Sequence, residues 1–233
     1  MRKFAGILAG LTLLAATSAS AAVSTTCGDP DTCTLDQLFG GDSITVDDVT
    51  FDSFALTDSL GLAVAPANVS VTGGGSATEA WIDFAFDPSL SIQGDSDFYG
   101  FLFSLIASLD PLSSRNIIGA SLSFNDGAFS ISGDATAETA AALGTGDFLD
   151  IYSDSLLGDE PLSAATFAAI ASLAADLQIN VLGYEPGALA TVSGFRFLVT
   201  LDEESPVIPL PAAAPIFLAG LGALGALRRR KPR

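Results

Sequence analysis

Short apolar stretches separated by turn residues are the feature that most restricts the fold of this chain. They fill residues 22–206, and Gly, Ser, Thr, Asp and Asn stand between them. Several alternate apolar and polar residues at a period of two, which is typical of strands. With no βαβ spacing, the pattern predicts a mainly β fold, an antiparallel, jelly-roll-like β-sandwich, in one domain over residues 22–205. The clearest expected strands are 43–46, 49–56, 68–71, 80–86, 98–109, 117–124, 128–132, 148–152, 177–182 and 190–201.

Two local patterns predict strand geometry in more detail. Phe51 and Phe54 lie three residues apart, which places them on opposite faces of a regular strand, so we expect this strand to be buried on both faces. Residues 121–124 and 127–132 alternate on either side of Asn125-Asp126-Gly127, a sequence typical of tight turns. They predict a β-hairpin.

Helical structure is expected in at most two places. Residues 34–39 have the composition of one short helical turn. Residues 161–176 are ambiguous, because Leu162, Phe167 and Ile170 belong to a set at helical spacing and the many alanines favour a helix.

The N-terminus has the three parts of a secretory signal peptide. A basic start and an apolar core at 4–16 precede small residues that place Ala19 and Ala21 in an A-x-A pattern. The core is shorter than the roughly 20 residues that span a bilayer. We expect Sec-type machinery to export the chain and residues 1–21 to be removed after Ala21, or after Ala22 as second choice.

The C-terminus ends in an apolar stretch and a basic cluster. Residues 209–227 are uncharged and about as long as a helix that crosses a bilayer. By the positive-inside rule the cluster behind them stays in the cytoplasm. It comprises Arg228, Arg229, Arg230 and Lys231. The exported chain is therefore expected to halt in the membrane with its acidic middle outside.

The tail over residues 206–233 resembles the VPLPA type of the PEP-CTERM class of bacterial sorting signals. Its motif, apolar helix and basic end come in the family order, with isoleucine at the first motif position where the family prefers valine. The motif residues are Ile208, Pro209, Leu210, Pro211 and Ala212. The resemblance implies that an exosortase of a Gram-negative bacterium cuts the tail near Pro211 and Ala212, and that the mature protein then leaves the inner membrane for the cell surface or the medium. A permanent membrane anchor is the alternative.

Residues 34–54 are similar to the start of many PEP-CTERM proteins. These share a Leu-rich turn, a Gly-Gly-x-Ser-Ile segment and a Thr-Phe-x-x-Phe strand. In that class the stretch matching 164–200 is an extended segment followed by a strand pair, so the resemblance favours β structure with at most a short helix over 161–176. It also implies an association with exopolysaccharide and biofilm.

Charge and composition exclude several functions. The net charge is −18, but residues 22–206 hold all 27 acids and only two bases, Arg115 and Arg196, which leaves −25 there. Such a segment has no basic surface for nucleic acid. It has no histidine or lysine, which excludes His-based catalysis and metal sites, Schiff-base chemistry and a P-loop.

Cys27 and Cys33 are the only cysteines, and five residues separate them. An exported chain folds in an oxidising compartment, so a disulfide bond between them is the expected state.

Three kinds of site remain for this composition. Paired carboxylates can hydrolyse glycosides, but 27 acids offer such pairs by chance, so we assign no catalytic residue and expect no enzymatic activity. Calcium is the only candidate cofactor, because it takes oxygen ligands. Asp95 and Asp97 are its favoured ligands, ahead of the acids at 29–31 and 125–127, although none of these segments matches an EF-hand loop.

Sugar binding through exposed aromatic residues is the third option. Trp81 and Tyr99 are the candidates, but the alternation around Trp81 fits a core position equally, and we favour the core. The sequence thus predicts an exported, non-catalytic surface or matrix protein that an exosortase processes. The alternatives are a secreted carbohydrate- or calcium-binding module and, less favoured, a secreted glycoside hydrolase.

Overall fold

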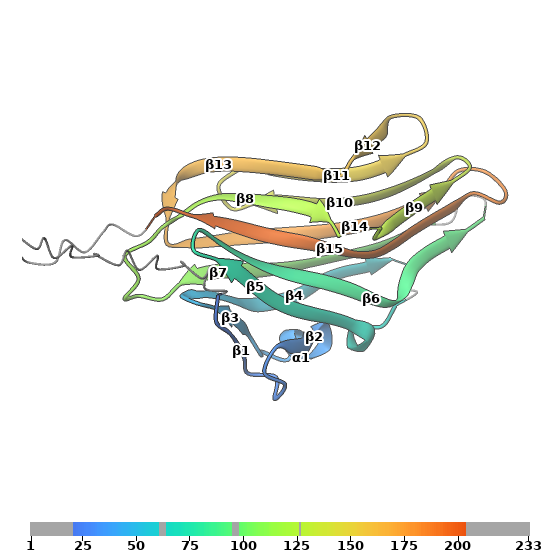
Figure 1. Ribbon diagram of the computed structural model, residues 1–233. Helices are drawn as coiled ribbons and strands as arrows, with labels where there is room; N and C mark the ends of the chain where they lie inside the picture. The colour runs from blue at the N-terminus through green and yellow to red at the C-terminus, as the bar shows by residue number, and fades with distance from the viewer. Residues whose placement is uncertain (1–20, 61–63, 95–97, 126, 204–233) are drawn as a thin grey trace, which may run out of the picture. The chain divides into compact units, whose positions relative to one another are not determined.

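The computed structural model describes residues 21–60, 64–94, 98–125 and 127–203. Nearly all of its regular structure is strand (Figure 1). The elements are β1 (Val23–Thr25), β2 (Thr32–Thr34), α1 (Leu35–Phe39), β3 (Ile44–Val46), β4 (Val49–Leu60), the 3-10 turn η1 (Pro66–Asn68), β5 (Val69–Ser76), β6 (Glu79–Gln93), β7 (Phe98–Leu109), β8 (Ile117–Phe124), β9 (Phe129–Ser132), β10 (Ala135–Leu143), β11 (Phe148–Asp154), β12 (Gly158–Glu160), β13 (Leu162–Ile170), β14 (Ser172–Gly183) and β15 (Leu189–Leu201).

The strands form two antiparallel sheets. Sheet A has the order β1-β3-β4-β7-β14-β10-β11-β12, and sheet B has the order β13-β8-β15-β6-β5-β2, with β9 also paired to β15. The two sheets enclose one hydrophobic core. The predicted antiparallel β-sandwich is therefore confirmed.

The core is made by the inward-facing residues of both sheets. Phe84 of β6 stacks on Phe195 of β15, with ring centroids 4.6 Å apart, and lies 5.3 Å from Phe103 on β7 of the other sheet. All three side chains are at most 1% exposed. Burying one such ring contributes about 1.5–3 kcal/mol, so these contacts hold the sheets together.

Residues 161–176 are extended, as the family resemblance implied. They contain all of β13 and the start of β14. In β13, Ala165 and Phe167 pack against the core, whereas Ala164 and Thr166 are exposed. Because alanines stand on both faces of β13, the alternation of apolar and polar residues is not visible in its sequence. The same alanines favour a helix in isolation, which explains the ambiguous prediction. The short helix is confirmed as α1, where Thr34 and Gln37 form a capping box.

The expectation that β4 is buried on both faces is wrong. Phe51 and Phe54 belong to the same core, at 0% and 5% exposure. Between them the register with β7 shifts, and Ser53 has a φ of 56°. This β-bulge adds a residue to β4, so an odd spacing brings both rings to one face.

The predicted hairpin at residues 125–127 is also wrong. β8 and β9 do not pair with each other, because both run antiparallel to β15, one after the other along its side. The amide of Ala128 donates to the carbonyl of Asn125, and Gly127 has a φ of 69°. The turn therefore lies between two strands that follow each other along the same side of β15. Its glycine with a positive φ would suit a hairpin loop equally well, so the local sequence is compatible with both structures.

Candidate functional site

The outer faces of the two sheets differ in charge. The register of sheet A places seven acids and no base on its outer face within the described residues. They are Asp52, Asp58, Glu138, Asp150, Asp154, Glu160 and Asp176. On sheet B the regularly paired strands place only Glu79, Asp83 and Arg196 outside, and Asp87 lies where the register of β6 with β15 shifts.

Trp81 lies on this outer face of sheet B and not in the core, so the core position that we favoured is wrong. Its neighbours in β6, Ala80 and Ile82, are 1% and 0% exposed and point inward, while Trp81 is half-buried on the other side. The second aromatic candidate, Tyr99, packs against the core. Of the two, Trp81 is the one whose side chain lies on an outer face.

The indole of Trp81 packs closely over β5. It stands opposite Gly74 in the register, and a Cβ at Gly74 would lie 2.7 Å from the indole Nε1. Only glycine leaves room for this contact. The side of the ring toward β15 meets Arg196, whose Cζ lies 4.6 Å from the ring centroid.

Arg196 and Asp83 face each other across β15 and β6. Nε of Arg196 donates to Oδ1 of Asp83 and Nη2 donates to Oδ2, both at 2.7 Å. The hydrogen bonds with Asp83 raise the pKa of Arg196 against the opposing effect of partial burial, and the charges of Asp83 and Glu79 add to the rise. The pair is 35% and 23% exposed, so both side chains reach solvent.

The residues around this group are mostly hydroxyl-bearing, with Leu198 directly opposite Trp81. Thr72 and Ser123 stand in register on either side of the Asp83–Arg196 pair, and Ser121 stands opposite Leu198. The result is an open face that offers an aromatic ring, a guanidinium, a carboxylate and hydroxyls. We call Trp81, Asp83 and Arg196 the Trp81 site. Sequence reasoning missed Arg196 and Asp83, because 113 residues separate them and no local pattern joins them.

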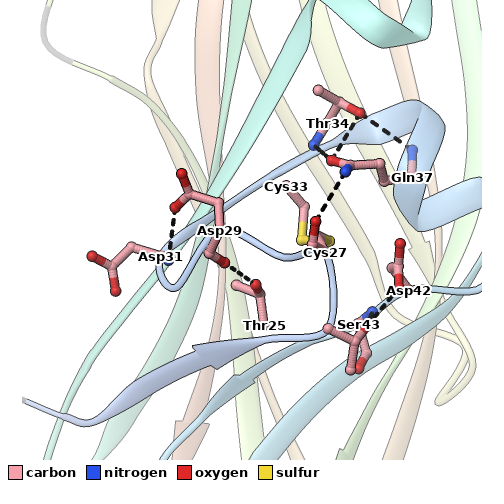
Figure 2. The surroundings of a disulfide bond; sticks show 10 residues. Thr25, Cys27, Asp29, Asp31, Cys33, Thr34, Gln37, Asp42 and Ser43 are labelled. Atoms are coloured by element: carbon pink, nitrogen blue, oxygen red, sulfur yellow. Dashed lines mark hydrogen bonds between the residues drawn. A yellow bond between two sulfur atoms is a disulfide. The ribbon is translucent and has the colours of Figure 1, made fainter.

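The predicted disulfide bond is confirmed. Cys27 and Cys33 are bonded, with their Cα atoms 5.5 Å apart. Figure 2 shows how the loop is joined to its surroundings: Nε2 of Gln37 in α1 donates to the carbonyl of Cys27 at 3.1 Å. The disulfide joins the segment after β1 to β2, and the hydrogen bond from Gln37 joins that segment to α1.

The acids of this loop, Asp29 and Asp31, form a turn. Oδ1 of Asp29 accepts the amide of Asp31 at 3.1 Å, as Figure 2 shows. Among the described residues no group of three or more Cys, Asp or Glu could hold a metal ion. The favoured calcium ligands, Asp95 and Asp97, lie outside the described residues.

Asp150 lies on the outer face of sheet A, in β11. Burial raises its pKa, and the charges of Glu138 and Glu160 raise it further. Its Oδ1 is buried and has no hydrogen-bond partner among the described residues. Next to it, Asn180 donates to Glu138 at 3.3 Å. The charged form of Asp150 is therefore less favourable in the folded protein than in water.

The terminal signals lie almost wholly outside the described residues. Ala19 of the cleavage site, the sorting motif at 208–212 and the basic cluster at 228–231 belong to the undescribed ends, and Ala21 is the first residue described. In the described ranges no helix is long and apolar enough to cross a membrane. The expected spanning segment at 209–227 lies outside those ranges.

No family model and no curated protein matches this chain. Among solved structures it is similar to the carbohydrate-binding module TmCBM61 in complex with β-1,4-galactotriose, at 10% identity and a TM-score of 0.29, over 57% of this chain and 87% of that one. It is also similar to the enzymatically active domain of tailspike protein 4 of bacteriophage CBA120, at 13% identity and a TM-score of 0.22, over 64% of this chain and 19% of the other. Neither value supports an inference about ligands or catalysis.

Proposed function

We propose that this chain is an exported, non-catalytic surface or matrix protein that binds polysaccharide through the outer face of sheet B. The position of Trp81 carries the proposal. It is the only tryptophan of the chain, and it lies outside the core, between Gly74 and Arg196. Its ring is held in place on the surface by Gly74 on one side and Arg196 on the other, and a fixed aromatic surface is one on which a ligand can pack.

The chemistry of the Trp81 site suits a sugar. The C–H face of a sugar ring packs on apolar aromatic surface, and its hydroxyls both donate and accept hydrogen bonds. Asp83 supplies acceptors and Arg196 supplies donors, in a fixed bidentate arrangement. Thr72 and Ser123, in register on either side of the Asp83–Arg196 pair, add hydroxyls that can bond to a sugar.

The export and sorting part of the proposal is supported by the sequence of the two ends and by the disulfide bond. Disulfides persist in oxidising compartments outside the cytoplasm. Cys27 lies six residues after the expected cleavage site at Ala21. We propose that the tail is then removed by an exosortase, which places the acidic domain at the cell surface or in an exopolysaccharide matrix.

Binding is tested with the mature protein recovered from the producing cells, by affinity electrophoresis against a panel of polysaccharides. We expect Trp81→Ala to weaken binding by about thirtyfold, the effect of removing an aromatic anchor worth about 2 kcal/mol. Phe148→Ala is the matched control, because Phe148 is 63% exposed and lies on the outer face of sheet A. Equal binding by all three proteins would contradict the proposal, and so would sugar release abolished by a single carboxylate substitution.

Sorting is tested by mass spectrometry of the mature C-terminus. We expect the chain to end near Pro211 and to lack peptides from the basic tail. Recovery of peptides ending in Arg233 from secreted material would exclude removal of the tail. Deletion of the producing cell's exosortase should retain the full-length chain in the membrane fraction.

A further inference from the structure

The outer face of sheet B carries few charges, although residues 22–206 carry −25: its regularly paired strands present Glu79, Asp83 and Arg196, and Asp87 lies where the register of β6 shifts. At the Trp81 site the charge of Arg196 is met by both oxygens of Asp83. The opposite face, on sheet A, has seven acids and no base among its described residues. We infer that the ligand of the Trp81 site is a neutral polysaccharide, without carboxylate, sulfate or phosphate groups. This inference rests on the proposed function.

Hydrogen-bonding chemistry supports a neutral ligand. A sugar hydroxyl can donate to Asp83 and accept from Arg196 at the same time. The two hydrogen bonds to Asp83 use Nε and Nη2 of Arg196, and in the described part of the chain Nη1 makes no hydrogen bond and remains as a donor. An anionic group can only accept, so it gains no hydrogen bond from Asp83 and is repelled by its charge.

Long-range electrostatics act in the same direction. A polyanion that approaches the site meets a domain of high negative charge, and no cluster of bases offsets it. The repulsion extends over about 8 Å at physiological salt and over about 30 Å at 0.01 M. A neutral polymer experiences none of this repulsion, so its affinity should depend little on salt.

The experiment compares neutral and anionic polysaccharides by affinity electrophoresis with the mature protein. The neutral probes are dextran, a β-glucan, a galactan and a xylan, and the anionic probes are alginate and polygalacturonate. Each is tested at low salt and at about 0.5 M salt, where screening is nearly complete. We expect Trp81-dependent binding to a neutral polymer, with less than a twofold change in affinity between the two conditions.

Three outcomes separate the inference from the proposed function. Trp81-dependent binding to a neutral polymer supports both. Trp81-dependent binding that is confined to the polyanions overturns the inference and leaves the proposed function standing. Binding that does not depend on Trp81, or no binding to any probe, overturns both.

An Asp83→Asn variant tests the pairing of Arg196 with Asp83 directly. The substitution keeps the size of the side chain and removes the carboxylate that is bonded to Arg196, and the thermal melting curve shows whether the protein is folded. We expect alginate binding to appear at about 0.15 M salt, where repulsion from the rest of the domain reaches only about 8 Å, and to disappear at about 0.5 M. If alginate binding stays undetectable at about 0.15 M salt in the folded variant, the pairing with Asp83 is not what excludes polyanions and the inference fails.

Discussion

Arg115 and Asp48 are 67 residues apart in the chain and form an ion pair at one end of the sandwich. Nε of Arg115 donates to Oδ2 of Asp48 at 3.0 Å, and Nη1 donates to the carbonyl of Ala77 at 2.7 Å. The Arg115 side chain is 7% exposed. The pair joins the turn after β3 to the loops before β6 and β8, so it is a structural contact that no local sequence pattern indicates.

Removal of Asp48 should therefore destabilise the fold. Asp48→Ala leaves a nearly buried guanidinium without its carboxylate, and we expect a loss of about 3 kcal/mol in the free energy of unfolding. Chemical denaturation measures it. Asp58→Ala, at an exposed position on the outer face of sheet A, is the control and should change little. Equal stability of the two variants would contradict a structural role for the pair.

The same pair predicts a loss of stability in acid. Burial works to raise the pKa of Asp48, but hydrogen bonds from Arg115 and Ser113 outweigh it, and the pKa lies below its ordinary value. The folded state thus binds this proton less tightly than the unfolded state. The stabilisation is present above about pH 4 and is lost as the pH falls through the folded pKa. Unfolding curves between pH 2 and 6 should show a steeper pH dependence for the native chain than for Asp48→Asn.

Asp150 predicts the opposite dependence. Burial first, then the charges of Glu138 and Glu160, raise its pKa, so the folded state binds the proton more tightly than the unfolded state. Its favourable contribution is complete below about pH 4 and is lost as the pH rises through the folded pKa. We expect Asp150→Asn to melt about 2 °C higher than the native chain at pH 7, with no difference in strong acid. Asp176→Asn, on the same face and exposed, should not change the melting temperature.

The disulfide bond should contribute modestly, because its loop is short. For a loop of this length, the chain-entropy estimate is about 2 kcal/mol. Its loss should also weaken the contact of Gln37 with Cys27 that ties the loop to α1. Denaturation of a Cys27→Ser/Cys33→Ser double variant measures the effect, with reductant added to the native chain as a second route to the same state. A double variant as stable as the oxidised native chain would refute this contribution.

Gly74→Ala should disturb the Trp81 site without removing any of its functional groups. The new Cβ would lie 2.7 Å from the indole, so the ring must move away from β5. We expect a cost of about 1–3 kcal/mol in stability and a loss of polysaccharide affinity. Because Trp81 is the only tryptophan, its fluorescence spectrum reports the displacement directly. Gly144→Ala is the control for stability, because its Cβ would meet Ala174 at 3.4 Å, an ordinary contact distance.

Much of the domain could be predicted because the rules involved act over a few residues. Alternation identified strands such as β8 and β15, the Thr34 and Gln37 pair matches a helix start, and the spacing of Cys27 and Cys33 in an exported chain indicated their bond. The errors arose where one local pattern suits two structures. Asn125 and Gly127 suit either a hairpin loop or an interruption within a strand, and the pairing of β8 and β9 with β15 is what distinguishes them.

The sequence by itself determined that Trp81 and Phe84 lie on opposite faces of β6, because side chains alternate along any strand. Only the tertiary structure decided which of them is buried. Phe103 from sheet A and Phe195 from β15 pack on Phe84, whereas the pairing of β6 with β15 brings Arg196 beside Trp81 on the outside. The physical reason is that a side chain is buried by residues distant in the chain, and alternation carries no information about what those residues are.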